Sequence, residues 1–361
     1  MLVESLITIV TFFPSDTTFT EIVFVFETLQ TRIRELAFLN SGVSIHLQDL
    51  RGGEEKNEHF QYDGEVSDNT RLYFLSKTDI LQDLNFDKIK QDLYSNDVVK
   101  VQIPITDDIP KTPFNKDYSQ KIDLLGLPLL NLYHKLDIYP VVYEGENYGK
   151  LIRHVAPMKF ANQHISSHGA QYDFCMHVDN PDLSIYGDAI KSIPSPDTLG
   201  FVCLRNNDKI STNILLLDDI LQFLTQTEIS LLCEPVFNIK RPDSFEGQNL
   251  IVKNLPLLNY FNGKYYSRFD THNVFSDKTE CNIILDKIKH IANNNNLIKE
   301  FILQKRDCII FNNQRVFHSR KAFKPNFDGN DRWLIRIFGL YNMPDQIFLK
   351  DKNDNHHIKI N

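Results

Sequence analysis

Three residues of the chain have the types and spacing for metal chemistry. His177-Val178-Asp179 lies near the middle of the chain, and His318 lies near its end. On a β-strand the first and third residues of such a motif point to the same face, so His177 and Asp179 can bind one ion. A third ligand from a distant strand would complete one face of an octahedron. Two imidazoles and one carboxylate in this arrangement suit Fe(II), with three positions open for a chelating co-substrate and dioxygen.

The motif His-x-Asp also occurs by chance in many proteins, so purely structural roles are an alternative interpretation. The sequence after His318 favours the metal hypothesis. Arg332 follows fourteen residues later, where a strand pattern resumes, and its guanidinium can form a bidentate pair with a carboxylate beside the metal. Arg336 lies on the same strand face as Arg332. Each arginine alone could equally be a solvated charge at a strand edge.

Many short strands must position these residues. After residue 137 the chain is rich in β-branched and aromatic segments separated by turns, which is typical of strands. We expect strands at 98–105, 139–143, 149–157, 171–177, 199–204, 214–217, 307–311, 316–319 and 332–340. We expect helices at 78–94, 218–232 and 280–303, and a disordered tail around His356-His357. This pattern favours a mainly β (α+β) fold, a double-stranded β-helix or jelly roll with helices packed outside.

The N-terminal segment has a pattern of its own. Residues 7–14 read as a strand, 20–39 carry apolar residues at helical spacing, and Asn40-Ser41-Gly42 is a typical helix stop. Strand patterns follow at 43–47 and 59–62. We therefore predict a small β-α-β-β segment before the jelly roll.

This segment resembles the start of the transducer region of the DNA gyrase B subunit. The resemblance rests on Val10–Ser15, the unbroken run Arg34–Val43, and Phe60–Gly64. The ATP-binding part that precedes this region in gyrase is missing, and no glycine-rich phosphate loop occurs in the chain. We therefore expect residues 1–70 to be a gyrase-like scaffold or appendage without gyrase activity.

The rest of the chain, residues 71–361, resembles the Fe(II)/2-oxoglutarate oxygenases. The strongest part runs from Asp307 through His318 to Arg336. It is most similar to the clavaminate synthase-like, taurine dioxygenase-related group, which includes hydroxylases of free amino acids. Supporting segments occur upstream in the right order, at 148–157, 166–167, 177–179, 202–205 and 269–270.

The resemblance implies a role for eight residues. His177, Asp179 and His318 would ligate Fe(II). Arg332 would bind the distal carboxylate of 2-oxoglutarate, and Thr212 would add a hydroxyl to it. The substrate would lie near Asp270, Arg336 and Ser167. Many close relatives have Glu where this chain has Asp179, and the loop 180–197 is long, so the substrate stays open.

The implied reaction consumes O2 and 2-oxoglutarate, releases succinate and CO2, and hydroxylates an unactivated C–H of an amino acid. That amino acid could be free, basic or carrier-bound, and desaturation or ring formation stay open. Another hypothesis is a non-catalytic binding protein whose gyrase-like segment engages gyrase or another partner. A third is an oxygenase that acts on a protein or nucleic-acid side group.

Composition restricts the remaining possibilities. The chain has 39 Lys and Arg against 47 Asp and Glu, a formal net charge of −8, which argues against a general nucleic-acid partner. Five scattered cysteines without a CxxC pair argue against a disulfide framework and favour a reduced, cytoplasmic protein. The N-terminus has no basic region before its apolar stretch, and the apolar stretch at 124–133 is too short to span a bilayer. The sequence does not indicate an oligomeric state.

Overall fold

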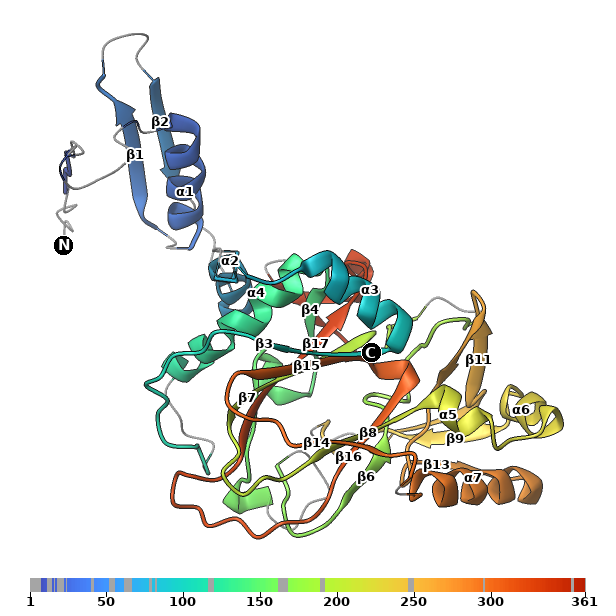
Figure 1. The fold of residues 1–361 in the computed structure, drawn as a ribbon. Helices are drawn as coiled ribbons and strands as arrows, with labels where there is room; N and C mark the ends of the chain where they lie inside the picture. The colour runs from blue at the N-terminus through green and yellow to red at the C-terminus, as the bar shows by residue number, and fades with distance from the viewer. Residues whose placement is uncertain are drawn as a thin grey trace, which may run out of the picture. The chain divides into compact units, whose positions relative to one another are not determined.

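The computed structural model describes most of the 361-residue chain. The described residues are 8–11, 15, 17, 23, 25–39, 42–51, 56–61, 67–77, 80–81, 83–115, 120–161, 168–188, 192–245, 250–294, 296–351 and 354–360. The chain divides into two compact units, Met1–Val66 and Ser67–Asn361 (Figure 1). That the first unit is gyrase-like and the second an oxygenase stays a prediction at this point.

The first unit is built from one helix and a two-stranded antiparallel sheet. Helix α1 spans Phe26–Leu39, and strands β1 and β2 span Ser44–Asp49 and Lys56–Gln61. Among the residues of this unit that the structure describes, Phe26, Ala37 and Phe60 are the buried apolar ones. The predicted helix and the two strands after it are therefore present. The predicted strand at 7–14 falls partly outside the described residues, and 8–11 contain no strand.

Two sheets, antiparallel except for one parallel pair in the larger, form the centre of the second unit. The larger contains β3 (Val98–Gln102), β4 (Tyr139–Tyr143), β5 (Arg153–Val155), β7 (Thr198–Arg205), β15 (Asp307–Asn312), β17 (Trp333–Leu340), β18 (Leu349–Asp351) and β19 (Asp354–Ile358). The smaller has the order β14 (Lys299–Phe301), β8 (Thr212–Leu216), β16 (Val316–Arg320), β6 (Phe174–His177). Apart from β18 and β19, neighbouring strands in each sheet come from distant parts of the chain, as in the predicted jelly roll.

The two sheets pack face to face, and helices cover their outer faces. On β7 and β17, Phe201 and Leu334 point inward to a cluster that includes Ile214 of the smaller sheet. Val202 and Ile335, their neighbours, point to the opposite face and pack against α3 (Phe86–Asn96) and α4 (Leu127–Lys135). Since both faces of these strands are covered, they read as nearly continuous apolar runs.

The outer face of the smaller sheet is covered by a second helical layer. It consists of α5 (Leu217–Leu221), α6 (Gln226–Leu232) and α7 (Thr279–Ala292), with β9 (Phe237–Lys240), β10 (Ile251–Leu255) and β13 (Val274–Ser276). Figure 1 shows these helices beside β9 and β13. A hairpin of β11 (Leu258–Phe261) and β12 (Lys264–Ser267) completes the unit.

Three predicted helices are wrong in extent. The expected helix at 78–94 begins only at Phe86, as α3, because the Asn85 side chain accepts the Lys88 N–H and caps it there. A helix that was not expected, α2 (Asp68–Leu75), lies before it. The expected helix at 280–303 ends at Ala292, and β14 follows it. The expected helix at 218–232 is divided into α5 and α6, since Thr225 begins a new helix with a capping box to Glu228.

The expected disorder of the C-terminal tail is also wrong. Residues Asp354–Ile358 form β19, which pairs in parallel with β4. The His356 ring is 2% exposed, hydrogen-bonds the Pro140 carbonyl at 2.8 Å and stacks on Tyr139. The charged composition concealed this strand because its buried residues alternate with exposed ones.

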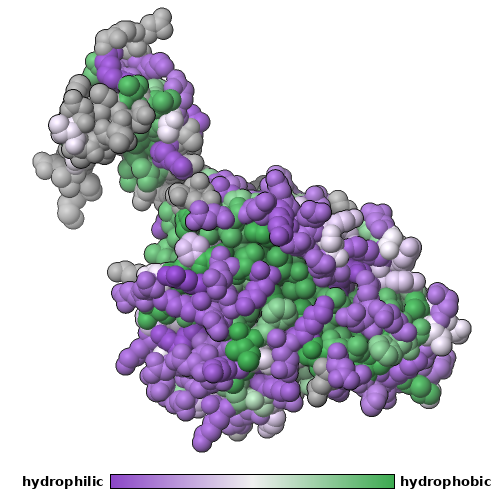
Figure 2. All heavy atoms as spheres, viewed as in Figure 1, coloured by the Kyte–Doolittle hydropathy of each residue, from purple (hydrophilic) through white to green (hydrophobic). Residues whose placement is uncertain are grey.

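None of the helices in the described part of the chain combines the length and apolar character needed to cross a bilayer. The face of the second unit seen in Figure 2 is largely hydrophilic, with hydrophobic residues gathered in separate patches.

The contact between α4 and the larger sheet gives a stability prediction. A Cβ at Gly200 would lie 2.6 Å from the hydroxyl of Tyr133, a fully buried ring that donates a hydrogen bond to the Ile337 carbonyl. Gly200→Ala should therefore lower the free energy of unfolding by about 2 kcal/mol. Urea unfolding followed by the fluorescence of Trp333, the single tryptophan, measures this. Thr227→Ala, on the exposed face of α6, should change it by less than about 0.5 kcal/mol.

Candidate metal centre

The pairing of β6 with β16 brings the two predicted histidines together. His318 lies directly opposite His177 in this antiparallel pair, and their ring centroids are 4.1 Å apart. Both point into the space between the sheets, while the alternating residues Met176 and Phe317 belong to the outer apolar cluster. Two residues that are far apart in the chain thus become neighbours through strand register.

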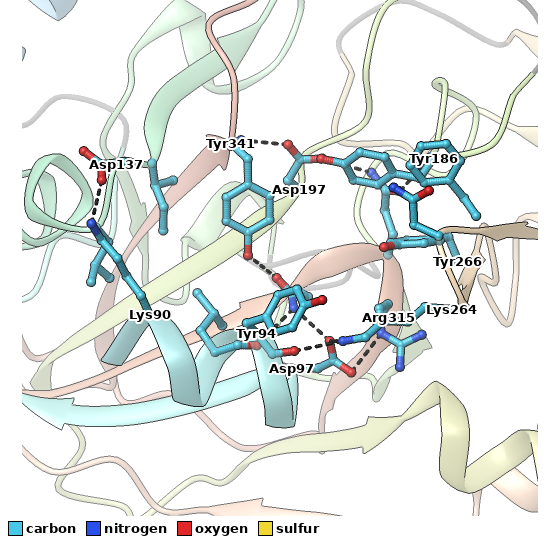
Figure 3. Close-up of a pocket in the computed structure, with 17 residues that line it drawn as sticks. Lys90, Tyr94, Asp97, Asp137, Tyr186, Asp197, Lys264, Tyr266, Arg315 and Tyr341 are labelled. Carbon is cyan, nitrogen blue, oxygen red and sulfur yellow. Dashed lines mark hydrogen bonds and ion pairs between the residues drawn. The ribbon is translucent and has the colours of Figure 1, made fainter. Parts of the chain in front are cut away.

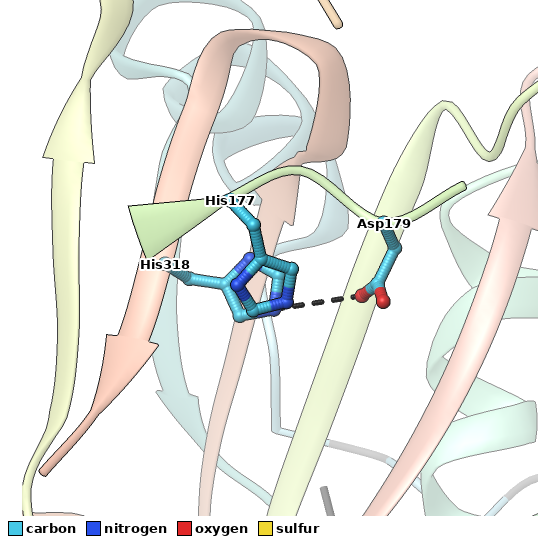
Figure 4. A group of neighbouring side chains, drawn as sticks. All are labelled: His177, Asp179 and His318. Atoms are coloured by element: carbon cyan, nitrogen blue, oxygen red, sulfur yellow. Dashed lines mark ion pairs between the residues drawn. The ribbon is translucent and has the colours of Figure 1, made fainter. Parts of the chain in front are cut away.

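Asp179 lies just beyond the end of β6, held there by a buried amide. The Asp179 N–H donates to Asn313 Oδ1 at 2.8 Å, and Asn313 Nδ2 donates to the Asp179 carbonyl at 2.9 Å. Asn313 is fully buried in the short 3-10 helix between β15 and β16. These two bonds take the place of the hydrogen bonds that a neighbouring strand would make. Since β6 ends at His177, the expectation that Asp179 itself lies on a strand is wrong. Its carboxylate still faces the two histidines (Figure 4).

The donor atoms of the three side chains fit a metal ion. One ligand atom from each of His177, Asp179 and His318 lies within 4.8 Å of the others. His177 Nδ1 lies 2.7 Å from the Cys175 carbonyl, which favours a proton on that nitrogen and leaves Nε2 free. His177 Nε2 and Asp179 Oδ2 are buried without a hydrogen-bond partner, and His318 Nε2 lies 3.5 Å from that oxygen. A bound cation would satisfy these atoms.

His177, Asp179 and His318 are called the trio below. The electrostatic environment keeps His318 neutral and Asp179 ionised, the forms in which they can bind a metal ion. Burial, together with the neighbouring His177, lowers the pKa of His318 to about 3, so its imidazole is neutral at pH 7. Burial alone would raise the pKa of Asp179, but its charged neighbours, Arg336 first among them, outweigh burial and lower the pKa. Asp179 is therefore ionised, and a neutral imidazole with a carboxylate is what a divalent ion requires.

Arg336 lies beside this trio and belongs to a buried charge network. Its Nη1 is 3.5 Å from Asp179 Oδ1, and its Nη2 donates to Glu146 Oε1 at 2.6 Å. Arg153, directly opposite Arg336 on β5, contacts the same Glu146 oxygen at 3.3 Å. Sequence reasoning missed Glu146 and Arg153. Glu146 follows a turn glycine, and the sequence around it has no motif that predicts a role. Arg153 lies in the segment 148–157, which the resemblance already includes.

Arg332 and Thr212 are neighbours, as the sequence predicts. Arg332 Nη2 donates to Thr212 Oγ1 at 2.9 Å, and its Nε is buried without a partner. Burial and the nearby Arg320 lower the pKa of Arg332 to about 10, so it stays charged. Among the described residues no carboxylate lies within ion-pairing distance of it. A buried guanidinium in this state is suited to an anionic ligand.

A cavity of about 220 Å³ opens beside His177 and Asp179; His318 does not line it. Its lining includes His177, Asp179, Arg336 and Asp270. The Asp270 carboxylate accepts hydrogen bonds from the N–H groups of His272 and Asn273 in its own turn. Its role toward a substrate stays a prediction.

The lining of this cavity differs in part from what the sequence predicts. Ser167 lies outside the described residues. The described part of loop 180–197 does not line this cavity, and neither do Arg332 and Thr212. Sequence reasoning missed the lining residues Lys240, Asp243 and His272.

Comparison with known proteins identifies the class of fold. Residues 236–338 match the family model described as Taurine catabolism dioxygenase TauD, TfdA family. The structure resembles an asparagine oxygenase solved with Fe(II), 2S,3S-3-hydroxyasparagine and succinate, with a TM-score of 0.65 and 18% identity over 76% of this chain and 84% of that one. The predicted oxygenase resemblance and jelly-roll fold are thereby confirmed.

Two further proteins that resemble this chain are solved with, or named for, an amino acid. The non-heme iron oxygenase OrfP, solved with Fe, succinate and (3R,4R)-dihydroxy-L-Arg, has a TM-score of 0.67 and 20% identity over 80% of this chain and 90% of that one. The L-lysine 3-hydroxylase of Catenulispora acidiphila is 22% identical over 213 residues, 55% of this chain. The chain spans about half, 54%, of that hydroxylase.

A short part of the chain matches a different protein, which confirms the second predicted resemblance. The DNA gyrase B subunit of Rickettsia felis is 58% identical over 57 residues, 16% of this chain. The chain spans only 7% of that gyrase protein. The match is therefore local to one short segment.

The position of Asn313 gives a prediction for metal binding. Asn313→Ala removes both bonds that hold the Asp179 backbone, so Mn(II), used as an air-stable substitute for Fe(II), should bind about 10- to 100-fold more weakly. Calorimetric titration measures this. Asn238→Ala, which removes a similarly buried amide that bonds Asp277 instead, should leave Mn(II) affinity unchanged. Equal affinities in the two variants would contradict the positioning role.

Proposed function

We propose that the chain is an Fe(II)- and 2-oxoglutarate-dependent dioxygenase that hydroxylates an unactivated C–H of a free amino acid. The observation that carries this proposal is the group of His177, Asp179 and His318, with ligand atoms within 4.8 Å of one another and with His177 Nε2 and Asp179 Oδ2 buried without a hydrogen-bond partner. Two imidazoles and one carboxylate with open positions are typical of non-heme Fe(II) oxygenases. Bound Fe(II) would supply the sites at which 2-oxoglutarate chelates and O2 is activated.

Arg332 is the residue best placed to select 2-oxoglutarate. Thr212, its hydrogen-bond partner, lies on the same strand face as Ile214, which is directly opposite His318 in the β8–β16 pair. The guanidinium and hydroxyl thus face the same inter-sheet space as the histidines. In the proposed role they hold the carboxylate remote from the metal, and the inner apolar cluster around Ile214 limits access of water.

The size and lining of the metal-side cavity favour a small polar substrate. Its volume of about 220 Å³ is below the roughly 300–1,000 Å³ of sites for drug-sized ligands. Both charge signs line it: Arg336 is positive, and Asp243 and Asp270 are negative. A zwitterionic amino acid suits such a lining. The relatives named for hydroxylated asparagine, hydroxylated arginine and lysine support an amino acid as substrate.

A non-catalytic binding protein is the less supported alternative. The gyrase-like match covers 16% of the chain, whereas the oxygenase-like structures cover three quarters or more of it. The intact trio and Arg332 also favour catalysis. We further propose a cytoplasmic location, because all five cysteines are free, as in a reducing compartment.

Succinate release tests the proposed reaction. Protein loaded anaerobically with Fe(II) and then given 2-oxoglutarate, O2 and single amino acids should release succinate faster with one or a few of them, including basic ones. The same amino acid should gain one oxygen atom by mass spectrometry, and its product should form in proportion to succinate. His177→Ala should abolish both.

The outcomes of this assay separate the proposals. If Fe(II) and 2-oxoglutarate bind but no amino acid stimulates succinate release, the free amino acid is the wrong substrate class. If neither Fe(II) nor 2-oxoglutarate binds, the oxygenase proposal fails.

Arg332 gives a second prediction for this function. Arg332→Gln should raise the KM for 2-oxoglutarate about 100-fold, equivalent to about 3 kcal/mol, because a charged hydrogen-bonding pair is lost. Steady-state succinate formation measures this, and Mn(II) affinity should stay unchanged. Arg306→Gln, at an exposed arginine that pairs with Asp107, should behave like the unmodified protein. A loss of metal binding in Arg332→Gln would contradict the assignment.

A further inference from the structure

A second and larger cavity lies apart from the metal centre. Its volume is about 530 Å³, and it shares no lining residue with the metal-side cavity. Helix α3, the β11–β12 hairpin, the segment after β15 and Tyr341 after β17 form its walls (Figure 3). This volume is in the range of small-molecule sites.

Tyrosine rings form much of its surface. Tyr186 and Tyr266 lie 4.9 Å apart between ring centroids, and Tyr341 projects into the cavity between Asp197 and Tyr94 in Figure 3. The Tyr341 ring is held by a hydrogen bond from its hydroxyl to Asn312 Oδ1. Tyr341 is still 40% exposed, so its ring face is open to a ligand. Such faces attract apolar groups and cations.

Most charges in the cavity are already paired with one another. Arg315 pairs with Asp97 at 2.8 Å, and Lys90 pairs with Asp137 at 2.5 Å. The ammonium of Lys264 donates to the Tyr94 carbonyl at 2.8 Å. These cations are therefore engaged within the protein, which disfavours an anionic ligand.

Asp197 is the exception. It is 9% exposed, and among the described residues no Lys, Arg or His lies within ion-pairing distance of it. Its partners are neutral donors: the Tyr341 N–H at 2.8 Å, the Tyr186 hydroxyl and, at 3.5 Å, the Gln314 amide. Burial raises the pKa of Asp197 to about 6, so at pH 7 most molecules hold a buried carboxylate without a counter-ion. Such a group attracts a cation strongly.

We propose that this cavity is a second ligand site, which binds a small organic ammonium ion carrying an aromatic or other apolar body. The ammonium pairs with the Asp197 carboxylate, and the body packs between the rings of Tyr186 and Tyr341. Charge pairing at Asp197 and cation–π contact with the rings both require the positive charge. A neutral molecule of the same shape retains only the apolar contact.

The test compares phenethylamine with phenethyl alcohol as probes. Calorimetric titration of the full-length protein, with Zn(II) and 2-oxoglutarate present at the metal centre, should give a dissociation constant of about 1 mM or lower for phenethylamine at pH 7.5. Phenethyl alcohol should bind at least about tenfold more weakly. Equal binding of the two probes, or no binding of the amine, would overturn the proposal.

Three variants locate the site. Asp197→Asn should weaken amine binding at least about tenfold, whereas Asp208→Asn, at an exposed carboxylate that does not line this cavity, should not change it. His177→Ala should also leave amine binding unchanged, because the metal-side cavity is separate. Unchanged binding in Asp197→Asn, or loss of binding in His177→Ala, would place the amine elsewhere and refute the proposal.

A fourth variant tests the site without depending on the folding of Asp197→Asn. Tyr341→Leu keeps the backbone N–H that bonds Asp197 but removes the ring, and it should weaken amine binding about three- to tenfold. Trp333 fluorescence should match that of the unmodified protein. If this folded variant binds the amine as tightly as the unmodified protein, the ring has no role and the proposed site is wrong.

Discussion

The register between β6 and β16 is the constraint on which the candidate site depends. It places His177 opposite His318, and a slip of one residue would turn His318 to the outer face and Phe317 to the inner one. Two features fix this register: Phe317 is buried in the outer apolar cluster, and β16 also pairs with β8 on its other edge. The chemistry of the site therefore depends on ordinary apolar packing of the smaller sheet.

The charged residues around the candidate metal centre can be buried between the sheets because their charges balance. Asp179 and Glu146 carry two negative charges, and Arg153 and Arg336 carry two positive ones. A divalent metal adds two positive charges, which the two carboxylates of 2-oxoglutarate would offset. In the proposed function, the metal and the co-substrate thus enter this low-dielectric region as a neutral set. The Arg332 guanidinium, which has no carboxylate partner among the described residues, adds a local preference for the co-substrate.

The sequence predicted the fold and the proximity of His177, Asp179 and His318 because strand alternation, a closely spaced motif and the resemblance of residues 307–336 all point to them. The alternation occurs in β7, β15 and β17, and the motif lies at 177–179. Glu146 and Asn313 could not be predicted in the same way, since their roles depend on strands that are distant in sequence. The β19 strand was missed because its charged residues concealed an alternating burial pattern, and the break before α3 was missed because one Asn85 cap outweighed the helical periodicity.

The most direct test of the account is the dependence of 2-oxoglutarate binding on the metal. Calorimetric titration under anaerobic conditions should give one Fe(II) per chain, with 2-oxoglutarate binding at least about 100-fold more tightly to the loaded protein. His318→Ala should lose both the iron and this enhancement. Equal 2-oxoglutarate affinity with and without Fe(II), or undiminished Fe(II) binding in His318→Ala, would contradict the assignment of the trio as the metal centre.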